Sequence, residues 1–456
     1  MIRRRRATVL VAAILAFAEI ARAATSFTEE RELGERFALE AAGSMPFVRD
    51  QAVVDFVNRI GGRMVAVLAA PQPFDYRIHV VRDGQLNAFA VPGGFLYLHS
   101  GLLLRAANDS ELAAVLGHEI VHVHAHHIVR QQEKTKIFSY ASLAAMLLAA
   151  VHPALAAAAA SAGGAVSLSY QREFEREADF TGMRVMQAAG FEPYGMVAFM
   201  KRLWEERRTM SVEIPPYWQS HPMTDERITN LETSLRGKTP PAGGIRPTWG
   251  YLKMQTIVRA LTDGRGATTA DLRAVAPDEH HALALQGLVI LRQGDAAGAR
   301  KTLETAKSRG VPELDTEIGL AALRAGDTTG AIRVLRGRVE TEPEDAVAHA
   351  TLGSALLRGG DFAGARHALA RALELAPYLD EAESDLGQSY GRAGDAPRGF
   401  YHLARARELR GEVEQAKADY EKVAAGLAEG TPEGDDARAR IEALEEVHRN
   451  RVIGRR

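Results

Sequence analysis

Two histidines and a glutamate stand at a spacing that can bind a metal ion and use it. They are His118, Glu119 and His122, in the run His-Glu-Ile-Val-His, and the residues before them have the apolar pattern of a helix. Residues four apart share one face of a helix, so both imidazoles can reach one ion. Two neutral imidazoles can bind Zn²⁺, and a carboxylate can take a proton from a water that the metal makes acidic. The spacing indicates a zinc peptidase, although so short a pattern also recurs by chance in unrelated chains.

A second pair of charged residues follows downstream. Glu175 and Asp179 are four apart in a segment with a helical pattern, so their carboxylates share a face. A catalytic zinc site has three protein ligands, and a further carboxylate can accept a hydrogen bond from a ligand imidazole. The alternative is an exposed charged helix, in which these carboxylates pair with Arg172 and Arg176. Because the histidine pair lies upstream, we expect the metal-binding arrangement.

Three more histidines, His124, His126 and His127, follow the pair closely. A straight helix cannot wrap three successive turns around one ion, so we expect these histidines to lie mostly at the surface or behind the ligands. Cysteine is absent from the 456 residues, which excludes disulfides, thiolate ligands and a cysteine nucleophile. Any metal must therefore be held by His, Asp or Glu.

The beginning of the chain has the pattern of an export signal. Residues 3–6 are arginines, residues 7–18 are apolar, and residues 21–23 read Ala-Arg-Ala. We expect residues 1–23 to be a signal peptide that exports the chain, with an uncleaved anchor as the alternative because Glu19 is an unusual charge next to the apolar run. Taking the five arginines and one glutamate of this segment from totals of 56 and 58 leaves 51 basic and 57 acidic residues. This balance argues against a nucleic-acid partner.

The elements that position the candidate ligands can be placed from the pattern. We expect helices within residues 26–70, a half-buried strand at residues 76–81, and a hairpin or a pair of edge strands within residues 86–98. Asparagine, aspartate and serine at residues 108–110 are good N-caps, so the helix with the histidine pair is expected to begin there.

One long segment, residues 137–170, contains no Lys, Arg, Asp or Glu. Pro153 divides it into two halves, each shorter than the roughly 20 apolar residues of a spanning helix. We therefore favour a buried or capping helical hairpin. The alternative is a hairpin that enters a membrane near the active site.

The C-terminal half contains an internal repeat. The pattern Gly-x₆-Gly-Asp begins at Gly287, Gly319, Gly353 and Gly387, at spacings of 32, 34 and 34 residues. A period of about 34 residues with paired amphipathic helices is typical of tetratricopeptide repeats. The helix that follows the last repeat is expected to cap the array, and the charged end of the chain is expected to be solvated.

The motifs together resemble one peptidase family. The metal-binding motif, the later Glu-x₃-Asp, the Gly-Phe-Glu-Pro at residues 190–193 and the His-Pro-x₄-Arg element of His221 and Arg227 are similar to the HtpX/Oma-type gluzincin peptidases, over about residues 30–235. With the export signal and the repeats, the chain resembles the periplasmic BepA-type members, which act in outer-membrane protein quality control. Having no cysteine, it departs from members that pair cysteines in the repeat domain.

The resemblance implies roles for individual residues. His118, His122 and Glu175 would bind one Zn²⁺ per chain, and Glu119 would be the base. Asp179 would orient a ligand histidine.

The His-Pro-x₄-Arg element is expected close to the metal from the motif match, and each of its two named residues has two alternative roles. His221 would stabilise the oxyanion, or it would act as a fourth zinc ligand that silences the enzyme. Arg227 would pair with Asp179 or with the substrate.

The predicted fold is mainly α with a small β-sheet, a zincin-like metallopeptidase domain followed by an α-solenoid of tetratricopeptide repeats. The expected parts are a signal peptide at residues 1–23, the peptidase at 24–236, a linker and connecting helix at 237–279, the repeats at 280–424 and a charged helix or tail at 425–456.

The expected activity is zinc-dependent hydrolysis of peptide bonds in misfolded or unassembled proteins of the cell envelope. The repeats would bind these clients or an outer-membrane assembly machinery, because such solenoids present concave peptide-binding surfaces. Two alternatives remain: a chaperone or adaptor whose peptidase site is mostly shut, and a membrane-embedded protease that uses residues 137–170. A further alternative is that the folded chain makes peripheral contact with a membrane.

Overall fold

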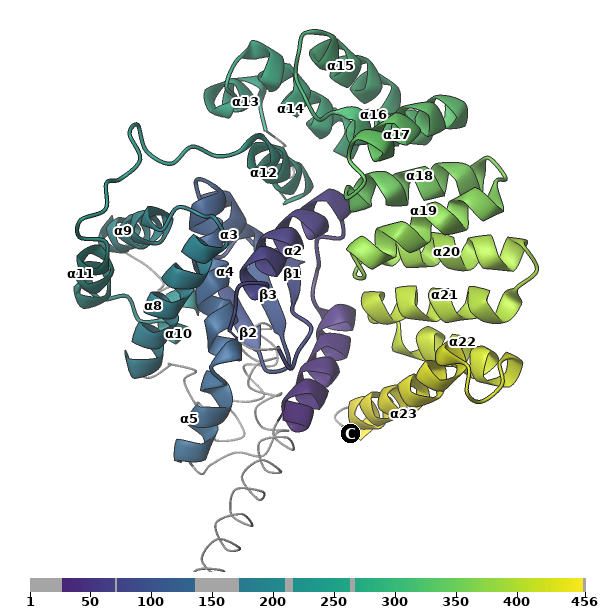
Figure 1. Ribbon diagram of the computed structural model, residues 1–456, viewed down its shortest axis with the longest axis horizontal. Helices are drawn as coiled ribbons and strands as arrows, with labels where there is room; N and C mark the ends of the chain where they lie inside the picture. Colours follow the sequence, from purple (N-terminus) through teal and green to yellow (C-terminus); the bar gives the residue numbers. More distant parts are fainter. Residues whose placement is uncertain (1–26, 70–71, 136–171, 210–215, 263–266, 454–456) are drawn as a thin grey trace, which may run out of the picture.

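The computed structural model describes residues 27–69, 72–135, 172–209, 216–262 and 267–453 (Figure 1). The signal peptide predicted for residues 1–23 and the hairpin predicted for residues 137–170 lie outside these ranges. A helix over residues 27–44 and α2 (Gln51–Val65) account for the helices predicted near the beginning.

A three-stranded sheet forms the centre of the N-terminal half. Strands β1 (Arg77–Val81), β2 (Ala88–Val91) and β3 (Phe95–His99) are arranged in the order β1-β3-β2. β1 is parallel to β3, and β2 is antiparallel to it, so the predicted hairpin is confirmed. One face of the sheet packs against α2 and α4, and the other packs against the helix over residues 27–44 (Figure 1).

Four helices carry or adjoin the predicted site residues, and α4 among them packs on β2 of the sheet. They are α4 (Asp109–His124), α8 (Arg172–Ala188), α10 (Pro216–Ser220) and α11 (Asp225–Ser234). α4 begins as predicted, because the side chain of Asn108 accepts a hydrogen bond from the backbone N–H of Glu111. Neighbouring helices are α3 (Ser100–Arg105), α5 (His127–Thr135) and α9 (Tyr194–Thr209).

α4 and α8 approach each other closely at two glycines. A Cβ added to Gly117 would lie 3.2 Å from the carbonyl oxygen of Gly182, and a Cβ added to Gly182 would lie 3.0 Å from the carbonyl carbon of Gly117. Both contacts are to backbone atoms, which cannot rotate away as a side chain can. The two backbones therefore lie side by side where α4 carries the histidine pair.

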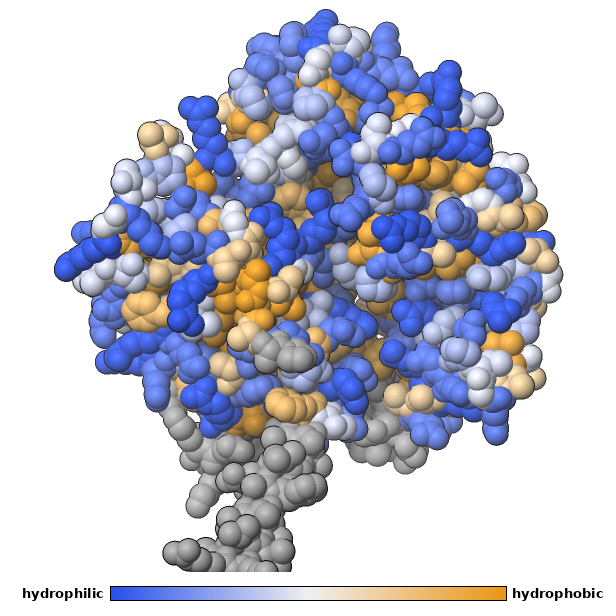
Figure 2. All heavy atoms as spheres, in the orientation of Figure 1, coloured by the Kyte–Doolittle hydropathy of each residue, from blue (hydrophilic) through white to orange (hydrophobic). Residues whose placement is uncertain are grey.

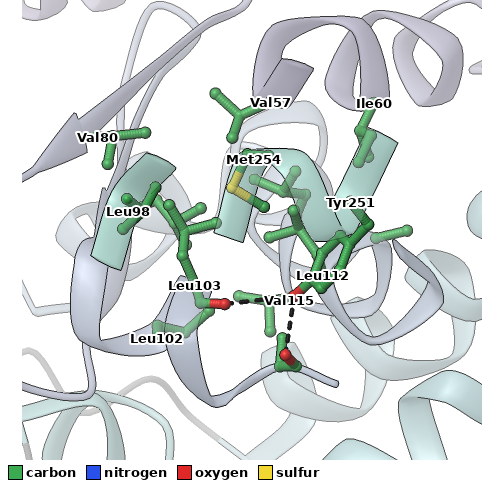
Figure 3. Packing of buried hydrophobic residues seen from close by; sticks show 14 of the residues in the cluster. Val57, Ile60, Val80, Leu98, Leu102, Leu103, Leu112, Val115, Tyr251 and Met254 are labelled. Atoms are coloured by element: carbon green, nitrogen blue, oxygen red, sulfur yellow. Dashed lines mark hydrogen bonds between the residues drawn. The ribbon is translucent and has the colours of Figure 1, made fainter. Parts of the chain in front are cut away.

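The connecting helix α12 (Trp249–Thr262) packs into the same hydrophobic core as the sheet (Figure 3). Its Tyr251 is fully buried, and the phenol donates to the carbonyl oxygens of Ala106 and Leu103 at 2.9 and 3.3 Å. Leu285 and Leu303 of the first repeat belong to this core as well. The core thus continues from the sheet into the repeats without a break.

Four helix pairs follow, as the repeat period predicted. After α13 (Thr269–Val275) they are α14 (Glu279–Arg292) with α15 (Ala296–Ser308), α16 (Asp315–Arg324) with α17 (Thr328–Thr341), α18 (Ala346–Arg358) with α19 (Phe362–Leu375), and α20 (Asp380–Arg392) with α21 (Ala396–Arg410). The Gly-Asp turns join the helices of each pair: Gly294 has φ +97°, and Asp295 caps α15 by accepting from the N–H of Gly298.

The end of the chain corrects one prediction. α22 (Val413–Gly426) and α23 (Pro432–Ile453) follow the repeats, and α23 buries Ala437 and Leu444 against this end of the array. The expected solvated end is therefore wrong for this part of α23, because small and apolar residues among its charges form a buried stripe.

The corner before α2 joins the two halves of the molecule. Asp50 caps α2 and also pairs with Arg292 of α14, with oxygen–nitrogen distances of 3.0 and 3.2 Å. Next to it, Arg49 donates to the carbonyl oxygens of Leu409 and Arg410 at the end of α21. Two consecutive residues therefore reach the first and the fourth helix pairs.

The surface shown in Figure 2 is mostly hydrophilic, with hydrophobic side chains gathered in smaller areas. Within the described ranges, no helix combines the length and the apolar character needed to cross a membrane.

Candidate metal centre

The structure brings all the predicted site residues together. α4 presents His118 and His122, α8 presents Glu175, and His221 follows α10. These four side chains are 1–2 % exposed, and each offers one donor atom within 4.8 Å of the others. His221 joins the cluster although it lies far along the chain from α4.

The donor atoms have the spacing of metal ligands. Nε2 of His122 is 3.0 Å from Nε2 of His118 and 3.4 Å from Oε1 of Glu175. Nδ1 of His221 is 2.9 Å from the same oxygen and 3.2 Å from Nε2 of His118. Around a tetrahedral Zn²⁺ with bonds of about 2.0–2.1 Å, ligand atoms are about 3.3–3.4 Å apart. The four donors therefore fit one tetrahedral ion.

The charges of the site also fit a divalent cation. Glu119, Glu175 and Asp179 are buried carboxylates, and Arg227 is the buried cation beside them. Burial favours the neutral imidazole, but the carboxylates of Glu175 and Asp179 outweigh it and raise the pKa of His118 to about 10. With His118 neutral, as a metal ligand must be, and the three carboxylates ionised, Arg227 leaves a buried excess of two negative charges, which an ion of charge +2 would balance.

His118 is held from behind by a carboxylate and a guanidinium. Its Nδ1 is 3.0 Å from Oδ1 of Asp179. Arg227 donates to both oxygens of Asp179 at 2.7 Å, and its Nη1 is 2.6 Å from Oε2 of Glu175. Of the two partners expected for Arg227, the structure shows Asp179. Arg227 also donates to the carbonyl oxygen of Pro222, so it holds the segment that carries His221.

His122 is held from behind by His127, one of the three histidines expected at the surface or behind the ligands. Nδ1 of His127 is 2.9 Å from Nδ1 of His122. His127 begins α5, after His126 turns the chain with φ +53°, in the left-handed region. Burial lowers the pKa of His127 to about 4, so its ring is neutral. Five residues beyond a ligand is the wrong spacing for one helical face, which is why the pattern gave no signal for this contact.

Glu119 lies beside the donors without joining them. One of its oxygens is 3.4 Å from Nε2 of His221. Both carboxylate oxygens are buried and have no hydrogen-bond partner among the described residues. Burial is the largest influence and raises the pKa of Glu119. A buried carboxylate with open acceptor sites and a raised pKa suits a general base.

Comparisons with known proteins agree with this site. Residues 54–235 match the model of Peptidase family M48, and residues 322–377 match that of a Tetratricopeptide repeat. The family resemblance inferred from the motifs is therefore confirmed for these two parts of the chain.

Three curated relatives are similar to this chain. The putative beta-barrel assembly-enhancing protease of Vibrio cholerae is 34% identical over 229 residues, which are 48% of this chain and 47% of that protein. The beta-barrel assembly-enhancing protease of Escherichia coli is 28% identical over 256 residues, 54% and 52% of the two chains. The mitochondrial metalloendopeptidase OMA1 of Saccharomyces cerevisiae is 32% identical over 165 residues, 35% and 47%. The matched part of the chain spans about half the length of these relatives.

Proposed function

We propose that this chain, whose residues 54–235 match the model of Peptidase family M48, is a zinc-dependent endopeptidase. The observation that carries the proposal is the convergence of four buried donors from three separate segments beside the buried carboxylate of Glu119, whose oxygens accept no hydrogen bond from the described residues. Imidazole and carboxylate donors at tetrahedral spacing favour Zn²⁺ among the divalent metals.

His118, His122 and Glu175 would hold the metal, which supplies Lewis-acid chemistry that polarises a carbonyl and makes water acidic near neutral pH. Glu119 takes the proton of the attacking water and delivers it to the leaving amine. Asp179, held by Arg227, accepts the Nδ1 proton of His118 and keeps that ring in the tautomer whose Nε2 can bind a metal.

The client class follows from the relatives and the repeats. Two relatives are named for enhancing beta-barrel assembly, and this chain has helical repeats beside its peptidase part. We infer that the substrates are misfolded or unassembled proteins of the cell envelope, met in the periplasm, with the repeats binding clients or an assembly machinery. β2 pairs only with β3 among the described strands, so its other edge could align an extended substrate.

A second function, that of a chaperone or adaptor with a closed peptidase site, has one supporting observation. Nδ1 of His221 stands where a fourth metal ligand would, at 2.9 Å from Glu175 and 3.2 Å from His118. A catalytic site needs an open position for water or substrate. His221 would then have to leave before hydrolysis begins.

The test is to measure the zinc content and casein cleavage of the full chain, of Glu119→Gln and of His221→Ala. The proposal expects about one zinc per chain and a loss of cleavage of at least about 100-fold in Glu119→Gln with the zinc retained. Faster cleavage by His221→Ala would indicate that His221 closes the site. Equal cleavage by wild type and Glu119→Gln, or no zinc in the wild type, would contradict the peptidase. Cleavage only in the presence of detergent would favour the membrane-embedded alternative.

A further inference from the structure

His127 lies behind the metal centre, on the side of His122 that faces away from the other donors. It is 0 % exposed, and its ring stacks on Phe174 with a centroid distance of 4.5 Å and an interplanar angle of 15°. The guanidinium of Arg130 lies 4.7 Å from the centroid of the same phenyl ring. Packing therefore fixes the plane of this imidazole.

Both ring nitrogens of His127 contact a polar atom. Nδ1 is 2.9 Å from Nδ1 of His122, and Nε2 is 3.2 Å from Oε2 of Glu177. Nη1 of Arg130 donates to the same oxygen at 3.1 Å. The side chains of Glu177 and Arg130 are each 40 % exposed. His127 thus connects a proposed metal ligand to an ion pair at the surface.

The chemistry of each group determines the direction of these hydrogen bonds. His122 turns Nε2 toward the other donors, and a neutral histidine that binds a metal through Nε2 carries its proton on Nδ1. His122 must therefore donate, and Nδ1 of His127 must accept. A neutral imidazole then has its proton on Nε2, which donates to Glu177, a carboxylate that can only accept. Every group in this series of hydrogen bonds therefore has a compatible role as donor or acceptor.

The two histidine ligands are supported in different ways. His118 meets a carboxylate directly, because its Nδ1 is 3.0 Å from Asp179. His122 meets a second imidazole, and the carboxylate of Glu177 lies one step further out. The turn at His126 makes this possible, and the ring of His126 is held by Glu30 at 2.9 Å.

We propose that His127 is a positioning residue of the metal centre, which accepts the Nδ1 proton of His122 and so directs the Nε2 lone pair of His122 to the metal. Glu177 and Arg130 fix the tautomer in which His127 can accept. The inference rests on the proposed metal site and adds to it a support for the second histidine. Loss of such a supporting group typically weakens metal affinity by about 10–100-fold.

The experiment compares the full chain with His127→Phe and His127→Gln. Glutamine offers a carbonyl oxygen to His122 and an amide N–H to Glu177, whereas phenylalanine retains an aromatic ring and loses both hydrogen bonds. The zinc dissociation constant is measured by competition with a chelator, and the absorption spectrum of the Co²⁺-substituted protein reports the ligand geometry. His124→Phe removes a neighbouring histidine that contacts Gln72 and is the matched control.

We expect zinc to bind about 10–100-fold more weakly to His127→Phe, with a changed Co²⁺ spectrum, and a clearly smaller loss in His127→Gln. Wild-type affinity in both variants, or equal losses in both, would overturn the inference, since equal losses indicate a packing role. If His127→Phe does not fold, Glu177→Ala removes the acceptor of the His127 Nε2 proton instead. An unchanged zinc affinity of Glu177→Ala would also overturn the inference. A wild type without zinc would overturn the proposed function together with this inference, whereas zinc-binding wild type with unaffected variants would overturn the inference alone.

Discussion

Gly182→Ala should push apart the two helices that build the metal centre. The added Cβ would lie 3.0 Å from the carbonyl carbon of Gly117, 3.1 Å from its oxygen and 3.1 Å from the backbone nitrogen of His118. All three neighbours are backbone atoms of α4, so relief requires the helices to separate. Overpacking of this kind costs about 1–3 kcal/mol. The higher helix propensity of alanine offsets this cost by a stabilisation of about 1 kcal/mol.

Gly62→Ala provides the matched control. Gly62 lies in α2, is exposed, and has nothing within 4 Å of an added Cβ. The gain in helix propensity is common to both variants, so the difference between them isolates the overpacking. We expect Gly62→Ala to gain about 1 kcal/mol and Gly182→Ala to be less stable than it by about 1–3 kcal/mol.

The assay has two readouts. Urea denaturation midpoints report stability, and chelator competition reports zinc affinity, which should fall in Gly182→Ala because His118 moves away from Glu175. Cleavage should fall by less than the roughly 100-fold that a 1 Å misplacement costs. A Gly182→Ala variant as stable as Gly62→Ala, with unchanged zinc affinity, would refute the claim that the contact of Gly117 with Gly182 positions the site.

Two further predictions concern other parts of the molecule. Burial lowers the pKa of His79 from 6.5 to about 3, so between these pH values the unfolded chain binds the additional proton and stability falls as the pH falls, by about 1.4 kcal/mol per pH unit from this residue. The ring of His79 stacks with those of Phe95 and Tyr97, so His79→Phe keeps an aromatic ring there. It should show a shallower loss of stability from pH 6 to 4 in denaturation experiments, and an equal slope would contradict a buried neutral ring. Asp50→Asn keeps an N-cap but weakens the ion pair with the buried Arg292, so its free energy of unfolding should fall by about 1–3 kcal/mol. Asp50→Ala also loses the cap and should lose about 1 kcal/mol more. Denaturation midpoints equal to that of the wild type would show that the ion pair does not stabilise the contact between α2 and α14.

Local pattern was sufficient for much of the architecture. The pairing of His118 with His122 follows from helical spacing alone, and the helix start at Asn108 follows from a capping side chain. The four helix pairs follow from a repeat period, because each pair packs mainly on its neighbours in the chain. The hairpin of β2 and β3 likewise needed only a turn of proline and glycines between two apolar runs.

Local pattern was insufficient where a contact depends on how separate elements pack. The charged end of the chain was expected to be solvated, but Leu444 of α23 is buried against the end of the array. Similarly, the connecting helix packs through Tyr251 into the core that includes the sheet. Hydrophobic periodicity cannot reveal this contact, because a periodic pattern shows that a helix face is apolar but not which element covers that face.

The metal centre shows where the sequence by itself stops. His118, Glu119 and His122 are set by one helix. Spacing marked Glu175 and Asp179 as candidate partners of that site, but only the resemblance to a family chose Glu175 as the ligand and added His221. Their distances arise from the close packing of α4 on α8 and from the salt bridges of Arg227. His127 was expected only at the surface or behind the ligands, and its particular contact with His122 depends on a left-handed turn at His126 that departs from helical spacing. Spacing along one helix is a local property of the chain, but the meeting of groups from different elements is decided only when the tertiary structure packs those elements together.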